Sequence, residues 1–207
     1  MKNTLKYILL IVIFLSGINS CIVVKHPEQE DVTPTINISP KPELDMQEEP
    51  IRSKRGDMIA FLPEEWFLVD IQDKVSNDIF AVAVNPDYTL SAVFSNIRKT
   101  DQIDETYRKE GLLGLARISL SRRERKTAGT VKQIGKYSPL SIGSNSFVKY
   151  EISTTSGALS SKVAVFRSSL GLYYEFALVP MDFTRHPIPG GEEYDKIFRS
   201  IVSTIKF

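Results

Sequence analysis

Residues 194–207 read Tyr194-Asp195-Lys196-Ile197-Phe198-Arg199-Ser200-Ile201-Val202-Ser203-Thr204-Ile205-Lys206-Phe207. The apolar side chains of this stretch recur at helical spacing on one stripe, formed by Tyr194, Ile197 or Phe198, Ile201 and Ile205. Gly190 and Gly191 break the chain before it, and the first turn carries the acidic residues that a helix N-terminus favours: Glu192, Glu193 and Asp195. The pattern predicts a C-terminal amphipathic helix that covers an apolar surface.

That surface is expected from short strands earlier in the chain. Apolar and polar residues alternate in several of these stretches, which is typical of strands. Turn sequences join two pairs of them into predicted hairpins, through Asn85-Pro86-Asp87-Tyr88 and through Ser168-Ser169-Leu170-Gly171. The predicted strands are residues 58–61, 66–70, 79–84, 89–96, 130–137, 147–153, 162–167 and 172–179.

One long helix is predicted from residue 101 to about residue 126. Its stripe is formed by Ile103, Tyr107, Gly111, Leu115 and Ile118. Asp101 and Asp104 suit the start of a helix, and the basic run Arg122-Arg123-Glu124-Arg125-Lys126 suits its end. The helix dipole, whose negative end lies at the C-terminus of the helix, explains this basic run most simply. The run could also be a docking patch for anionic lipid or an acidic partner. Strands and helices together predict an α+β fold.

The order of these elements resembles that of a known family. An early Phe61-Leu62-Pro63-Glu64-Glu65-Trp66 segment, a hairpin, a long helix, several strands and the closing helix follow one another. This order resembles the PsbP-like domains, which include a photosystem II extrinsic subunit, a eukaryotic Ran-binding factor and small bacterial lipoproteins. The resemblance spans roughly residues 57–207. It implies an antiparallel β-sheet covered by helices on its faces, an α/β/α sandwich, and a binding or assembly module rather than an enzyme.

The N-terminus has the layout of an export signal. Lys2 and Lys6 precede an apolar run over residues 7–15, which is shorter than the roughly 20 residues of a membrane-spanning helix. Residues 1–20 are therefore predicted to be a signal peptide. Its end, Ile18-Asn19-Ser20-Cys21, resembles the lipobox of bacterial lipoproteins, although Asn19 departs from the usual small residue. The only cysteine of the chain, Cys21, is then the lipid attachment site.

A lipidated Cys21 would hold the protein on a membrane, because several buried acyl chains give lasting attachment. The predicted location is the bacterial cell envelope, with the domain facing the periplasm or the exterior. By resemblance to some enteric lipoproteins, an acidic residue after the cysteine would signal retention in the inner membrane; Ile22 stands there instead, so the outer membrane is favoured in a cell that has two. The alternative is an ordinary signal peptide cut elsewhere, which would leave Cys21 as a free thiol or an intermolecular disulfide partner.

Residues 21–56 are predicted to be the lipidated N-terminus and a disordered, proline-rich linker. This region shows no helical or strand period, and five prolines interrupt it: Pro27, Pro34, Pro40, Pro42 and Pro50. A late basic cluster of Arg52, Lys54 and Arg55 could touch anionic head groups, although plain solvation is the simpler interpretation. Residues 57–207 have the length of one domain with a full core.

Composition and motifs limit the function. With 26 Lys and Arg against 25 Asp and Glu, the chain lacks the basic excess of nucleic-acid-binding proteins. No cofactor or metal is predicted, because the two histidines, His26 and His186, stand apart and phosphate-cradling glycine patterns are missing. The predicted function is non-enzymatic binding of an unknown protein partner, or assembly of a complex, at the membrane. The candidate partner-binding residues are Arg122, Arg123, Arg125, Lys126 and Tyr173, the last as one of a group of exposed aromatic residues.

Two alternatives stay open. A hydrolase or other enzyme could use Asp182 and His186, whose spacing would allow a base and the group that orients it. A carrier could instead hold a small apolar ligand between the sheet and a helix, which requires an unfilled interior.

Overall fold

The computed structural model describes residues 31–71, 76–154, 160–182 and 186–207. The predicted signal peptide, Cys21 and His26 lie outside these residues. In the described part of the chain, no helix combines the length and the apolarity that a bilayer crossing requires.

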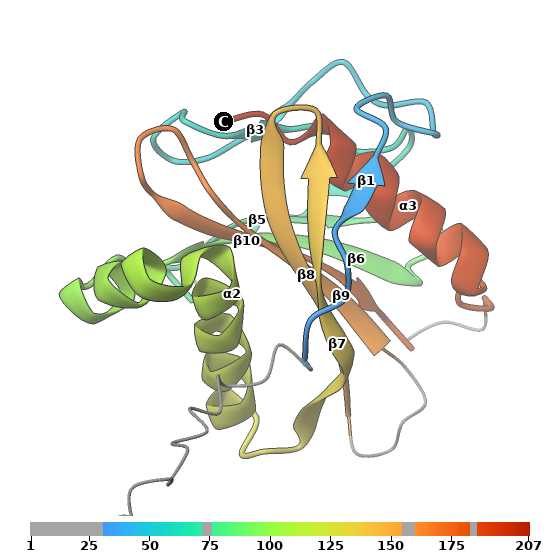
Figure 1. Cartoon of the computed structure of the whole chain (residues 1–207). Coiled ribbons are helices and arrows are strands. Elements are labelled where there is room, and N and C mark those ends of the chain that lie inside the picture. The colour runs from blue at the N-terminus through green and yellow to red at the C-terminus, as the bar shows by residue number, and fades with distance from the viewer. Residues whose placement is uncertain (1–30, 72–75, 155–159, 183–185) are drawn as a thin grey trace, which may run out of the picture. The chain divides into compact units, whose positions relative to one another are not determined.

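The described residues form an α+β domain around an eight-stranded sheet with the strand order β1-β7-β8-β9-β10-β6-β5-β4 (Figure 1). All neighbouring strands are antiparallel except β1 and β7, which are parallel, so the predicted antiparallel sheet is in fact mixed. A separate two-stranded sheet joins β2 to β3. The strands are β1 Ile36–Ile38, β2 Ile51–Arg52, β3 Ile59–Ala60, β4 Phe67–Leu68, β5 Ile79–Val84, β6 Leu90–Ile97, β7 Val131–Ile142, β8 Asn145–Thr154, β9 Ser160–Arg167 and β10 Tyr173–Pro180.

The two predicted hairpins are present, β5 with β6 and β9 with β10. Strand β7 is longer than predicted, because it continues past Tyr137 through Pro139 to Ile142. Its register shifts between Ile134 and Ser138, where Gly135 adopts a positive φ of 64°. A glycine and a proline within one strand weaken the sequence pattern, which explains why the prediction ended early.

The helix α3, Gly191–Thr204, covers one face of the sheet and confirms the predicted C-terminal helix. Phe198 of α3 stacks on Phe176 of β10 with the ring centroids 5.6 Å apart, and Phe176 packs on Phe94 of β6 at 5.0 Å. Burying an aromatic side chain of this size contributes about 2 to 3 kcal/mol to stability. Trp66 is buried in the same core.

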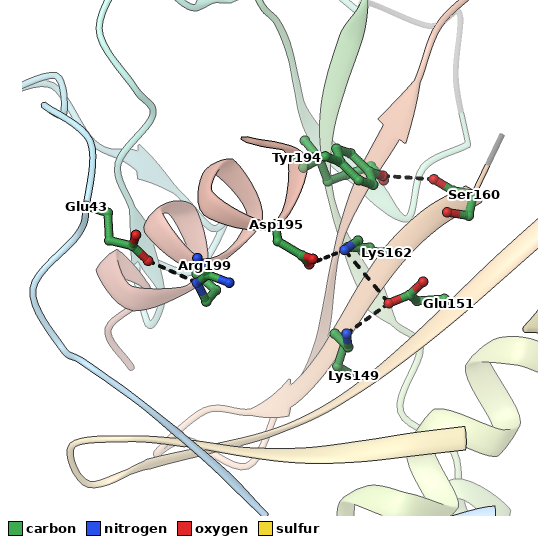
Figure 2. A network of polar contacts seen from close by, with 9 residues as sticks. Glu43, Lys149, Glu151, Ser160, Lys162, Tyr194, Asp195 and Arg199 are labelled. Carbon is green, nitrogen blue, oxygen red and sulfur yellow. Dashed lines mark hydrogen bonds and ion pairs between the residues drawn. The ribbon is translucent and has the colours of Figure 1, made fainter. Parts of the chain in front are cut away.

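Charged residues fix the start of α3 to the sheet (Figure 2). Lys162 of β9 is only 5% exposed, and its ammonium group pairs with the carboxylate of Asp195 and lies 3.9 Å from that of Glu151. The same ammonium lies 5.0 Å from the ring centre of Tyr194, whose hydroxyl donates to the carbonyl of Leu178 at 2.6 Å. A buried lysine is stable only when its charge is compensated in this way. The network therefore sets how α3 crosses strands β8 to β10.

The helix α2, Asp101–Lys126, covers the opposite face and has the predicted bounds. Its second half buries Leu115, Ala116 and Leu120 against a cluster that includes Tyr150, Val163 and Val165. The two helices thus lie on opposite faces of the sheet, which confirms the predicted α/β/α sandwich.

The described part of the predicted linker, residues 31–56, belongs to the folded domain. Strand β1 pairs with β7, with Ile36 opposite Leu140, and Ile51 of β2 is buried in the core. Glu43 accepts a hydrogen bond from Arg199 of α3 at 2.9 Å (Figure 2). The prolines in the described part of this region all lie outside the strands: Pro34, Pro40, Pro42 and Pro50. They fall in the segments between strands and therefore do not prevent strand formation. The described part of the domain therefore begins at Asp31 and not at the predicted residue 57.

Candidate functional site

Helix α2 is bent, and a hollow of the described surface lies along the bend. Gly111 has φ 62° and ψ −145°, which are not helical angles and which L-residues rarely adopt. Gly114 lies one turn further on, and its lack of a side chain lets the part of the helix before the bend approach closely. A Cβ atom at this position would lie 2.8 Å from side-chain atoms of Thr106 and Glu110. Figure 1 shows the resulting two limbs of α2 at a wide angle to each other.

The groove along this bent helix has a volume of about 660 Å³ and is open to solvent. Its basic side chains are Arg117, Arg122 and Arg125, and its apolar ones are Ile103 and Ile118. We refer to this hollow as the α2 groove. Mixed apolar and cationic lining suits a segment of a protein partner better than a small apolar ligand.

Arg117 and Arg125 are the accessible cations of the α2 groove. Arg117 pairs with Glu110 at 2.7 Å, but both side chains are nearly half exposed, so water screens the pair and its net contribution to stability is small. Arg125 is exposed, and its Nε donates only to the carbonyl of Ser121, at 3.4 Å. Both guanidinium groups could therefore turn to an incoming carboxylate at little cost.

Arg122 belongs to the groove but is partly engaged. Its guanidinium lies 3.0 Å from the carboxylate of Asp78, which precedes β5, and about a quarter of its side chain is exposed. Lys126 is exposed at the end of α2 and does not line the groove.

Arg123 does not line the α2 groove; its side chain reaches the contact between α2 and the sheet, although about a quarter of it is exposed. Its Nη2 donates to Oε1 of Glu175 at 2.7 Å, and Glu175 also accepts from Ser95 and Ser119. Burial disfavours the charged guanidinium, but its interactions with Glu175 and Tyr150 together outweigh burial and raise the pKa of Arg123. The charge of Arg123 is thus engaged in docking α2 on the sheet, and partner binding by Arg123 stays a prediction that this ion pair does not favour.

Tyr173 is also internal, contrary to the prediction of an exposed aromatic group. It is 3% exposed, its ring packs on Tyr107 at a centroid distance of 5.4 Å, and its hydroxyl donates to Asp104 at 2.7 Å. Burial, followed by the bond to Asp104, raises the pKa of Tyr173 to about 12. Strand β10 is an interior strand of the sheet and lies between β9 and β6. The first limb of α2, which carries Asp104, covers the side chain of Tyr173.

The residues of the enzyme alternative lie on the surface. Asp182 and His186 are both exposed in the loop between β10 and α3, and neither lines the α2 groove. Among the described residues, no group of three or more His, Cys, Asp and Glu side chains could hold a metal ion.

The interior between the sheet and α3, where a carrier would hold its ligand, is occupied by aromatic side chains. Phe166 stacks on Tyr174 at 5.6 Å and on Phe207 at 5.1 Å. Phe166 and Tyr174 belong to the same buried cluster as Phe94, Phe176 and Phe198, and the partly buried Phe207 packs against this cluster. A core packed in this way does not favour the carrier alternative.

The sequence analysis missed most of the groove. Arg117, Ile103 and Ser121 were not predicted as site residues, although Ile103 lies on the predicted apolar stripe of the helix. The available signal was the pair Gly111 and Gly114, because two glycines within one predicted helix often mark a kink. We placed Gly111 on the apolar stripe of a straight helix, and the structure shows that it ends the first limb.

Comparison with known proteins gives similarities in structure alone. No protein-family model matches the sequence, and no curated protein matches it. The solution structure of a cyanobacterial PsbP (CyanoP) from Synechocystis is 15% identical, covers 78% of this chain and 92% of that chain, and has a TM-score of 0.49. A crystal structure from Bacteroides thetaiotaomicron is 13% identical, with 78% of this chain and 48% of that chain covered and a TM-score of 0.36. At these identities the likeness concerns the fold alone.

Proposed function

We propose that this chain is a non-enzymatic lipoprotein of the bacterial cell envelope, anchored through Cys21, whose domain binds an acidic segment of a protein partner in the α2 groove. The single observation that carries the binding proposal is the groove itself, which is lined by Arg117, Arg122 and Arg125. Two other hollows of the described surface are smaller, with volumes of about 380 and 250 Å³.

The charge of the groove supports an acidic partner. Among the described residues that line the groove, one is acidic, Glu110, and three are arginines. Arginine forms paired, charge-assisted hydrogen bonds with carboxylates, which give both affinity and orientation. Ile103 and Ile118 would add apolar contact beside these bonds.

The sequence of the N-terminus supports the anchor. If Cys21 is lipidated, the ten steps of chain that separate Cys21 from Asp31 span at most about 35 Å. Because the chain is held on the domain from residue 31 onward, this short reach would keep the α2 groove near the membrane that carries the anchor. The partner is therefore expected to be a membrane protein or a protein of the same membrane surface.

Site-specific photo-crosslinking in cells tests the binding proposal. A crosslinking amino acid in place of Ser121, an exposed residue of the groove, is expected to give one discrete adduct with a partner. Charge reversal of two groove arginines, Arg117→Glu with Arg125→Glu, should abolish that adduct. Arg108→Glu is the matched control, because Arg108 is exposed on the same helix but outside the groove.

The adduct should persist in the control variant. An adduct that is equally strong after reversal of the groove arginines, or no discrete adduct at all, would contradict the proposal. Because surface substitutions usually change stability by less than about 0.5 kcal/mol, a loss of the adduct would reflect the groove rather than unfolding, which circular dichroism can verify.

A further inference from the structure

A second recess opens at the end of the sheet where β6 finishes and β10 begins, and its volume is about 380 Å³. Lys54 and Arg55 reach it from the turn after β2, and Arg98 and Lys99 follow β6. Tyr173 and Tyr174, at the start of β10, form part of its wall. Segments far apart in the sequence thus bring four cationic side chains to one place, which we name the basic recess.

The carboxylates around the basic recess are already engaged. Asp78 lines the recess and is bound by Arg122 at 3.0 Å and by Arg98 at 3.8 Å. Two further carboxylates belong to residues that contact its wall: Asp104 is bound by Tyr173 at 2.7 Å and Lys99 at 3.5 Å, and Asp57 by the hydroxyls of Ser53, Ser168 and Tyr174. Hydrogen bonds from Ser168, Tyr174 and Ser53 outweigh burial and lower the pKa of Asp57, so its charge is committed to these hydroxyls.

Lys54 and Arg55 carry the positive charge that remains. Within the ranges that the structure describes, no ion pair joins either of them to a carboxylate. The Nζ atom of Lys54 lies 3.5 Å from the carbonyl of Asn77, at the outer limit of a hydrogen bond, and both side chains are exposed. Arg98 and Lys99 are partly compensated by Asp78 and Asp104, whereas Lys54 and Arg55 have no such carboxylate among the described residues. The recess therefore keeps a positive potential that attracts an anion.

We propose that the basic recess binds a phosphate group, carried either by a lipid head group or by a free phosphate. A phosphate offers several acceptor oxygens and up to two negative charges, which match two arginine forks and two lysine ammonium groups better than a single carboxylate does. The volume suits a head group or a small phosphorylated molecule and is too small for a protein segment of several residues. This site is separate from the α2 groove and would add an anion-binding activity to the proposed partner binding.

Calorimetric titration of the full-length protein in a neutral detergent tests this site. The two probes are inorganic phosphate and dioctanoyl phosphatidic acid, a short-chain lipid whose head group is a phosphate, each at 150 mM sodium chloride so that diffuse attraction is screened. The test variant combines Lys54→Ala with Arg55→Ala. The matched control removes two exposed cations outside the recess, Arg52→Ala with Lys126→Ala.

We expect saturable binding of at least one probe to the wild-type protein and to the control, and a dissociation constant at least about tenfold higher in the test variant. Similar affinity for both probes would assign the site to free phosphate. Binding of the lipid alone, or much tighter binding of the lipid, would assign it to a head group. Binding of neither probe, or an equal loss in the control variant, would overturn the proposal, and neither result would affect crosslinking from the α2 groove.

Discussion

Asp57 is the residue through which one carboxylate connects three separate parts of the domain. Its Oδ1 accepts from Ser53 at 2.8 Å and from Tyr174 at 2.5 Å, and its Oδ2 accepts from Ser168 at 2.5 Å. Ser168 and Tyr174 lie 111 and 117 positions away along the chain. These bonds tie the turn after β2 to the β9–β10 hairpin, and they also position the wall of the basic recess.

The substitution Asp57→Asn should lower the free energy of unfolding by about 2 kcal/mol at pH 7, because it removes the charge that these hydroxyls bind and places a donor amide among donors. The folded-state pKa of Asp57 lies below its ordinary value of 3.8. Its stabilising effect is therefore complete above pH 3.8 and is lost as the pH falls through the lowered folded-state pKa. Urea unfolding of both proteins at pH 7 and at pH 3 measures this, and the difference between them should shrink at pH 3.

The control for this prediction is Glu64→Gln, an exposed carboxylate that should change the free energy of unfolding by less than about 0.5 kcal/mol. A difference between wild type and Asp57→Asn that stays constant from pH 7 to pH 3 would contradict the role of the charge.

The sequence could not reveal residues of this kind. The spacing of Asp182 and His186 is visible within one loop, so it attracted an enzymatic interpretation, whereas the partners of Asp57 come together only after folding. The same holds for Arg123, whose place in a basic run suggested a surface role. Its actual partner, Glu175, lies 52 positions away on β10.

At the scale of elements, periodicity predicted most of the domain. The bounds of α2 agree with the prediction at both ends, and α3 and the two hairpins lie where their patterns placed them. The elements that were not predicted are those whose residues show little hydrophobic periodicity of their own. Strand β1, with three residues, owes its place to pairing with Leu140–Ile142 of β7, which no local pattern shows.

The bend of α2 was missed for a different reason. Gly111 fits the spacing of the apolar stripe, so the stripe predicted one straight helix. The positive φ of Gly111 and the close approach of Thr106 to Gly114 depend on how the two limbs pack, and spacing alone carries no information on this.

The substitution Gly111→Ala tests whether the bend builds the α2 groove. Open space surrounds the position where the new Cβ atom would lie, so the expected cost of about 1 to 3 kcal/mol comes from the left-handed backbone angle alone. If the helix straightens to relieve this strain, the groove is lost, and crosslinking from Ser121 should weaken. Thermal unfolding and the crosslinking assay measure the two effects.

The matched control is Gly191→Ala, at the first residue of α3. Nothing lies within 4 Å of a Cβ atom there and its φ is not positive, so stability should be unchanged or slightly higher. Equal destabilisation by both substitutions would show that the angle at Gly111 is not special.

At the scale of the whole molecule, the sequence predicted the layered architecture but placed its N-terminal edge too late. Prolines and acidic residues made residues 22–56 look like a tether, yet from residue 31 onward the chain pairs with β7, bonds to α3 and enters the core through Ile51. A disordered segment of that length would let the domain move far from its anchor. The shorter connection confines both the α2 groove and the basic recess to the neighbourhood of the membrane, provided that Cys21 carries the lipid.

The anchor is therefore the prediction on which the membrane setting of both proposed sites depends. Intact mass of the protein extracted from membranes should show a chain that begins at residue 21 and carries added acyl mass. Cys21→Ser should abolish that species, because no other cysteine is present to accept a lipid. Ser20→Ala is the matched control, since it keeps a small residue before the cysteine and should be processed like the wild type. A soluble, unacylated wild-type protein would remove the membrane from the account, and the partner of the α2 groove would then have to be sought in solution.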